Sequence, residues 1–290
     1  MSDATEPSSD GTSPSSTTRR RIVGGRDLPQ AIAVGALLAF LFLGSLVWHP
    51  AAFTIVVGGL TVIGYVETGR VLRTVDLHLE VAVAVVATLV MLFGAYQAGH
   101  AGQAVGVAVL LVGGILAQLA DGGRQDVVRT LGVTTLLGLW VGFLASYAVL
   151  LVNRPSGGTL VGFAVVGAAI FTDIGGYAFG VAVGRHRIAP SVSPNKTWEG
   201  LLGGVLTCVV LLAVLLPRFG GLFTWQTAAV LGAACGVASF VGDLTESMIK
   251  RDLGVKDLGE VLPGHGGVLD RVDGILLALP VGYYVVELLV

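Results

Sequence analysis

The sequence predicts an all-α integral membrane protein that crosses the bilayer several times. Only 12% of its 290 residues are charged and 54% are hydrophobic, and the mean hydropathy is +0.84. Soluble domains typically have roughly 25% charged residues, about twice the share found here. The apolar residues form long continuous runs, whereas the strands of an outer-membrane barrel would alternate polar and apolar residues.

The chain begins with a polar segment and continues as about nine apolar runs. Residues 1–29 are rich in Ser, Thr, Asp and Pro and cannot bury enough apolar surface to fold, so a disordered cytoplasmic tail is expected. Residues 30–152 are expected to form an N-terminal group of transmembrane helices, and residues 153–290 a C-terminal group that holds the candidate site. The expected spans are 31–48, 52–67, 79–97, 104–120, 128–152, 159–183, 200–217, 226–247 and 274–290.

The distribution of Lys and Arg between alternate loops indicates the orientation of the chain in the membrane. If the N-terminus is cytoplasmic, only Arg154 and Arg218 of the 17 basic residues fall on the far side. Basic residues concentrate in cytoplasmic loops. The sequence therefore predicts a multi-pass protein of the inner membrane whose two strongly polar loops face the cytoplasm. The net charge of −2 gives no support for a nucleic-acid partner.

The most polar part of the chain after the tail is residues 242–273, which lie between two apolar runs. Charged residues are costly to hold beside the membrane, so we expect this segment to carry function. Several of its side chains are spaced to lie on one face of a helix at the end of the eighth span. These side chains are Asp243, Glu246, Ser247 and Lys250.

The second half of the same segment combines glycines with acids. Gly266 and Gly267 follow His265, and glycines leave backbone N–H groups free to surround an anion. Asp270 and Asp273 stand three residues apart at the start of the ninth span, where carboxylates suit the helix dipole. An ordinary loop histidine is the alternative reading of His265.

Two polar features precede this segment. Asp173 lies inside the sixth span, where a carboxylate needs a partner or a polar cavity. In the basic loop of residues 184–200, Ser193 and Thr197 place hydroxyls near Lys196, a combination that suits a phosphate. The alternatives without a ligand are a helix-packing aspartate and a positively charged loop with an interfacial tryptophan.

Carboxylates from two helix ends that face a loop rich in Lys, Arg and Gly indicate a hard divalent cation holding a polyphosphate. The sequence has no His/Cys cluster for zinc, no Walker A loop and no G-x-S-x-G turn. The pattern favours displacement at phosphorus, which needs positioning and charge neutralisation more than a protein nucleophile.

The same residues resemble the signature of the phosphatidate cytidylyltransferase (CDP-diacylglycerol synthase) family. The run from Ser193 to Gly200 is similar to the family's second motif, with Asn195 where many members have Lys. The resemblance is closest over residues 159–290. The segments that carry the signature are Ser247–Arg251, Lys256-Asp257, Leu262-Pro263, His265–Gly267 and Asp270–Asp273.

The resemblance implies transfer of a cytidylyl group from CTP to phosphatidic acid by a homodimeric, Mg²⁺-dependent membrane enzyme, with a second metal or a monovalent ion left open. By position, Asp243 and Asp270 would hold the metal. The other residues that it assigns to catalysis are Lys250, Arg251, Lys256, Asp257, His265, Arg271 and Asp273. Those that it assigns to substrate binding are Asp173, Ser193, Lys196, Thr197, Glu246, Ser247, Gly266 and Gly267.

Three other functions fit parts of the pattern. A CTP-dependent enzyme acting on another lipid, such as a polyprenol or dolichol kinase, would share the polyphosphate site. A transporter could use Asp173 and Asp243 as a coupling site, although the acids gather at one face rather than at the membrane midplane. A catalytically silent scaffold would not need every carboxylate and base of the motif.

Overall fold

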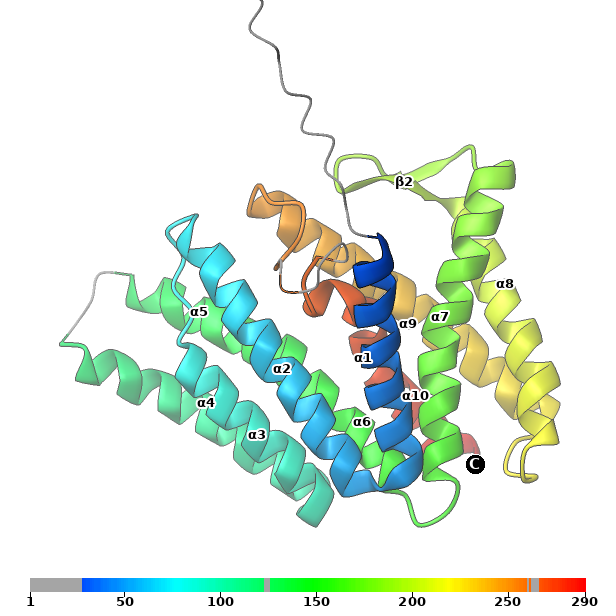
Figure 1. The fold of residues 1–290 in the computed structure, drawn as a ribbon, viewed down its shortest axis with the longest axis horizontal. Helices are drawn as coiled ribbons and strands as arrows, with labels where there is room; N and C mark the ends of the chain where they lie inside the picture. The colour runs from blue at the N-terminus through cyan, green and yellow to red at the C-terminus, as the bar shows by residue number, and fades with distance from the viewer. Residues whose placement is uncertain (1–27, 123–125, 260, 262–265) are drawn as a thin grey trace, which may run out of the picture.

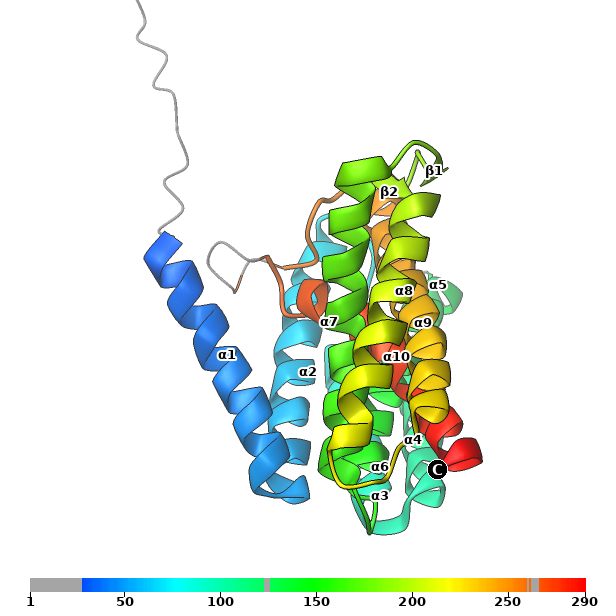
Figure 2. The ribbon, with the colours of Figure 1, turned by 90° about the vertical axis from the view of Figure 1, so that its right-hand side faces the viewer.

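Helices form nearly all of the regular structure in the described residues, and their axes run roughly side by side (Figures 1 and 2). The computed structural model describes residues 28–122, 126–259, 261 and 266–290. The predicted tail of residues 1–29 therefore lies almost entirely outside them. The helices are α1 (Leu28–Trp48), α2 (Pro50–Arg73), α3 (Val81–Ala98), α4 (His100–Ala120), α5 (Val127–Leu137), η1 (Gly138–Phe143), α6 (Leu144–Val152), α7 (Gly158–Val183), α8 (Trp198–Leu215), η2 (Leu216–Arg218), α9 (Trp225–Asp252), η3 (Leu269–Arg271) and α10 (Asp273–Leu289).

A helical segment covers each apolar run that was predicted to span the membrane, which confirms the all-α polytopic class. Among the described residues, seven helical segments are long and apolar enough to cross a bilayer. Helix α1 contributes a shorter apolar stretch, Gly35–Trp48, and α10 has 17 residues. The count of nine spans therefore stays a prediction. The segments that qualify are 50–73, 81–98, 100–120, 127–152, 158–183, 198–218 and 225–252.

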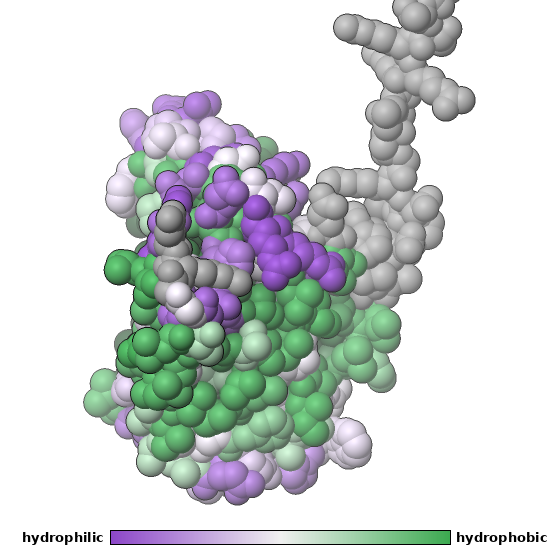
Figure 3. Space-filling view, turned by 90° about the vertical axis from the view of Figure 1, so that its left-hand side faces the viewer, coloured by the Kyte–Doolittle hydropathy of each residue, from purple (hydrophilic) through white to green (hydrophobic). Residues whose placement is uncertain are grey.

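The face of the molecule drawn in Figure 3 has a broad apolar zone between two polar ends. Many large apolar side chains of the helices are exposed, among them Phe40, Leu119 and Leu202. Exposed apolar surface of this extent is typical of a protein that contacts lipid. This apolar zone is what the continuous apolar runs of the sequence predict.

The C-terminal helices pack closely because glycines bring their backbones together. Helix α7 packs against α8 and α9, and α9 packs against α10. At Gly242 of α9, a Cβ atom would lie only 2.6 Å from the carbonyl oxygen of Asp273, so a side chain there would push α10 away. This contact places the polar end of α9 beside the start of α10. Helix α10 also packs against α6, across the division predicted at residues 152 and 153, and the division itself stays a prediction.

The two strongly polar loops lie at the same end of the helix bundle, the end at which α1 begins (Figure 1). The loop of residues 184–197 holds an antiparallel hairpin of β1 (Arg187–Ala189) and β2 (Ser193–Thr197), which the sequence did not predict. Helix α8 begins at Trp198, two residues before the expected start of the seventh span at residue 200. Thr197 is the N-cap of α8, and its Oγ1 accepts a hydrogen bond from the Gly200 N–H at 3.1 Å.

Candidate active site

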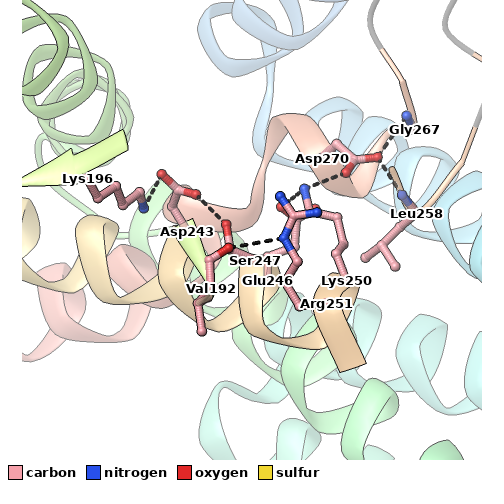
Figure 4. Close-up of polar contacts among 10 residues, drawn as sticks. All are labelled: Val192, Lys196, Asp243, Glu246, Ser247, Lys250, Arg251, Leu258, Gly267 and Asp270. Atoms are coloured by element: carbon pink, nitrogen blue, oxygen red, sulfur yellow. Dashed lines mark hydrogen bonds and ion pairs between the residues drawn. The ribbon is translucent and has the colours of Figure 1, made fainter. Parts of the chain in front are cut away.

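Lys250 links the end of α9 to the short helix η3. Its Nζ donates a hydrogen bond to Asp270 Oδ1 at 2.8 Å and also contacts Glu246 Oε2, one turn earlier on α9 (Figure 4). The side chains of Glu246 and Asp270 are 1% and 2% exposed. The ammonium of Lys250 thus lies between two buried carboxyl groups. Buried acids are costly unless they are paired, and Lys250 pairs with both of them.

The second carboxylate oxygen of Asp270 is held by the backbone of the loop between α9 and η3. Oδ2 accepts hydrogen bonds from the N–H groups of Leu258 and Gly267, both at 2.9 Å. Burial disfavours the charged form, but the hydrogen bonds from Lys250 and Gly267 outweigh it and hold the pKa of Asp270 below its ordinary value. Asp270 is therefore a fixed, ionised group at neutral pH.

A second ion pair joins the hairpin to α9. Lys196 of β2 forms it with Asp243, and the Lys196 Nζ lies 4.6 Å from the centre of the Phe240 ring. Ser247 Oγ is 3.5 Å from Asp243 Oδ1, at the outer limit of a hydrogen bond. Arg251 adds another link, because its Nε donates to the carbonyl oxygen of Val192 at 3.1 Å (Figure 4). The structure thus brings the two polar loops together at the end of α9.

The remaining acids of the sequence pattern surround this group. Asp173 is exposed on α7 and lies within electrostatic range of Asp243, Asp273 and Lys196. Asp273 is half-buried at the first position of α10. Acids of α7, α9 and α10 are therefore close enough to interact electrostatically, and their common role in a site stays a prediction.

Other predicted site residues take more peripheral positions. Ser193 begins β2, and Thr197 is occupied as the N-cap of α8. Lys256 is exposed, and Asp257 is half-buried beside Gly266, where a Cβ would lie 3.3 Å from Asp257 Oδ1. Gly266 has a φ of +78°, a conformation that glycine adopts without strain. His265 lies outside the described residues.

Sequence reasoning missed Glu67, which is 3% exposed near the end of α2. Its Oε1 accepts a hydrogen bond from the Val261 N–H at 2.7 Å, and its Oε2 accepts one from the Val268 N–H at 2.8 Å. Both donors belong to the loop that holds Asp270. A signal was present in the sequence, because an acid at the edge of an otherwise apolar run calls for a partner.

An apolar cavity of about 350 Å³ extends from the turn between α1 and α2 to the loop end of the bundle. Its walls come from α1, α2, η1, α6, α7 and α10, and Val268, Leu269 and Arg271 line it as well. Arg271 is exposed and follows Asp270 directly. Leu269 and Arg271, which flank Asp270 in the chain, both line the cavity, so this apolar space reaches the segment that holds Asp270.

The two ion pairs, Lys196 with Asp243 and Lys250 with Asp270, form a charged group whose carboxylate oxygens suit a hard divalent cation. The described residues contain no cluster of three or more His, Cys, Asp or Glu side chains arranged to hold a metal. Asp243 and Asp270 nevertheless offer carboxylate oxygens, and each is neutralised by a lysine. Mg²⁺ is commonly bound by one or two carboxylates together with substrate phosphates rather than by an all-protein cage. Two separate aspartates are compatible with that mode.

The chain is similar to known proteins over most of its length. A model of the Cytidylyltransferase family matches residues 29–289. The chain is 32% identical to the phosphatidate cytidylyltransferase of Mycobacterium bovis over 277 residues, which cover 91% of this chain and 90% of that protein. It is 46% identical to the enzyme of the same name from Synechocystis over 140 residues, 47% of this chain and 46% of the other. The chain therefore belongs to the cytidylyltransferase family.

Proposed function

We propose that the protein is a phosphatidate cytidylyltransferase, which converts CTP and phosphatidic acid to CDP-diacylglycerol and pyrophosphate. The observation that carries the proposal is that the ion pair of Asp270 with Lys250 adjoins an apolar cavity, because Leu269 and Arg271, the neighbours of Asp270 in the chain, line that cavity. A polyphosphate needs the first environment and acyl chains need the second. The names of the relatives support the same assignment.

In this reaction, a phosphate oxygen of phosphatidic acid attacks the α-phosphorus of CTP and pyrophosphate leaves. Lys196, Lys250 and Arg251 would neutralise phosphate charge, and their contacts with Asp243, Asp270 and the Val192 carbonyl gather them at the end of α9. The two lysines form ion pairs in the structure, so substrate phosphates would share them with Asp243 and Asp270. Positioning and neutralisation of this kind supply most of the catalysis in phosphoryl-type transfer.

We further propose that Asp243 and Asp270 hold Mg²⁺, which would neutralise charge on the phosphates of CTP. Asp173 and Asp273 would complete the acidic surroundings of that position. The charged end of the bundle would face the cytoplasm and CTP, with the protein in the inner membrane and its N-terminus inside. Phosphatidic acid would enter sideways from the bilayer. The homodimer implied by the sequence resemblance stays a prediction.

Isotope position separates cytidylyl transfer from a kinase reaction. Purified protein in mixed micelles with phosphatidic acid and Mg²⁺ should move the label of α-³²P-CTP into lipid, and the label of γ-³²P-CTP into pyrophosphate. Both transfers should stop when EDTA removes the metal. A lipid kinase would instead move the γ-label onto polyprenol or dolichol. Failure to label lipid from α-³²P-CTP would contradict the proposal.

The cavity should set the affinity for the lipid substrate. Ala39 of α1 lines it, so Ala39→Trp should fill space that an acyl chain would use. Loss of about 1.4 kcal/mol of acyl burial would raise the KM for phosphatidic acid roughly tenfold, with the KM for CTP unchanged. Ala36→Trp is the matched control, because Ala36 is exposed on the same helix and outside the cavity lining. Equal lipid KM values for the two variants would disprove this use of the cavity.

A further inference from the structure

We infer that Glu67 is a positioning residue that fixes the loop holding Asp270. The inference rests on the proposed function for its consequence in catalysis, but its structural basis is independent of the reaction. Glu67 belongs to α2, far along the chain from the residues that carry the sequence signature. Its side chain is buried and joins α2 to a loop about 200 residues away along the chain.

The first step is the pattern of hydrogen bonds that Glu67 accepts. Its two oxygens accept from two different backbone N–H groups, those of Val261 and Val268, at 2.7 and 2.8 Å. A buried carboxyl group is costly unless its oxygens are satisfied, and here each oxygen has a donor. Because the two donors are seven residues apart, one rigid side chain fixes two points of the loop at once.

The second step is the route from Glu67 to the candidate site. Val268 directly follows Gly267, whose N–H donates to Asp270 Oδ2 at 2.9 Å. A Cβ at Gly259 would lie 2.5 Å from the Glu67 carboxyl carbon, and a Cβ at Gly267 would lie 2.9 Å from Gly259 Cα. Glu67, the backbones of Gly259 and Gly267, and Asp270 are therefore packed in direct succession.

The third step is the rigidity of α2 near Glu67. Tyr65 is 0% exposed, and its hydroxyl lies 2.9 Å from Thr88 Oγ1 of α3 and 3.3 Å from the carbonyl oxygen of Leu137 of α5. A Cβ at Gly64 would lie 2.9 Å from Leu269, so α2 also packs directly on η3. Glu67 therefore projects from a fixed helix, which is what the support of a catalytic loop requires.

Glu67→Gln tests the inference with the smallest change of shape. An amide has one acceptor oxygen, so its NH₂ group would face one of the two backbone donors. We expect kcat to fall about 10- to 100-fold, the range typical of residues that orient a functional group. The KM for phosphatidic acid should change less than twofold. Glu67→Asp, which is too short to reach both donors, should show a similar loss of kcat.

Glu80→Gln is the matched control, because the Glu80 carboxyl group accepts a hydrogen bond from Gln118 of α4 at 2.8 Å rather than from the loop that holds Asp270. Hydrogen exchange without substrates supplies a second readout. In both Glu67 variants the amides of residues 253–272 should exchange faster, while those of α3 and α4 keep their wild-type rates. Faster exchange throughout the protein would indicate a general role in stability and overturn the inference.

The remaining outcomes are also decisive. A kcat for Glu67→Gln equal to that of Glu80→Gln would overturn the positioning role, as would aggregation of both Glu67 variants, which would assign Glu67 to folding. A wild-type protein that forms no labelled lipid would refute the proposed function instead. The exchange experiment would still decide whether Glu67 fixes the loop.

Discussion

Asp270→Asn should lower the rate of cytidylyl transfer by about 10²- to 10³-fold, equivalent to roughly 3–4 kcal/mol of lost transition-state stabilisation. One carboxylate oxygen of Asp270 accepts a hydrogen bond from Lys250, and the other accepts hydrogen bonds from two backbone N–H groups. These three partners are all donors. An asparagine has a single acceptor oxygen. Whichever way its amide is turned, the NH₂ group would face either the Lys250 ammonium or the backbone donors.

The same substitution removes the negative charge that the proposed metal site needs. The loss should therefore appear in kcat and in the Mg²⁺ concentration that gives half-maximal rate, with the KM for phosphatidic acid little changed. Labelled CTP and a Mg²⁺ titration measure these quantities. Asp252→Asn is the control, since Asp252 is an exposed acid at the same end of α9. A variant at position 270 that stayed as active as the one at 252 would exclude Asp270 from the site.

The membrane architecture was predictable because it depends on composition over whole segments. Runs of about 20 apolar residues indicate spans whatever their neighbours are. The helix ends were less predictable. The eighth span was expected to end at residue 247, and helix α9 continues to Asp252, past Lys250, which its spacing from Asp243 had already placed on a helix. The hairpin was missed because its strands have three and five residues and one of them contains Pro194.

The sequence indicated which residues belong to the candidate site, but not which of their side chains form ion pairs with one another. The spacing of Glu246 and Lys250 on one turn of helix predicts their contact. The pairs Lys196–Asp243 and Lys250–Asp270 depend on how the loops fold back over α9, which local periodicity does not contain. Glu67 lies farther still from the signature, and only the packing of α2 against η3 reveals its partners.

Lys250→Met should destabilise the protein by about 3–5 kcal/mol, the usual cost of removing one partner from a buried ionic group. The side chain of Lys250 is 16% exposed and serves two carboxyl groups that are nearly inaccessible. Methionine keeps the length of the side chain but leaves Glu246 and Asp270 facing each other without a cation. Thermal unfolding in detergent should show the loss, and Lys256→Met provides the control, because Lys256 is exposed.

Combining Lys250→Met with Asp270→Asn separates stability from chemistry. If the ionic contact dominates, the double variant should be less destabilised than the sum of the two single variants, because a neutral amide at position 270 no longer needs the ammonium. Its cytidylyl transfer should remain as low as that of Asp270→Asn, since the carboxylate is still missing. Additive losses of stability would mean that Lys250 does not act through Asp270. Activity that returned together with stability would show that the pair serves the fold alone, and the transfer of CMP would then have to depend on Asp243 and the hairpin.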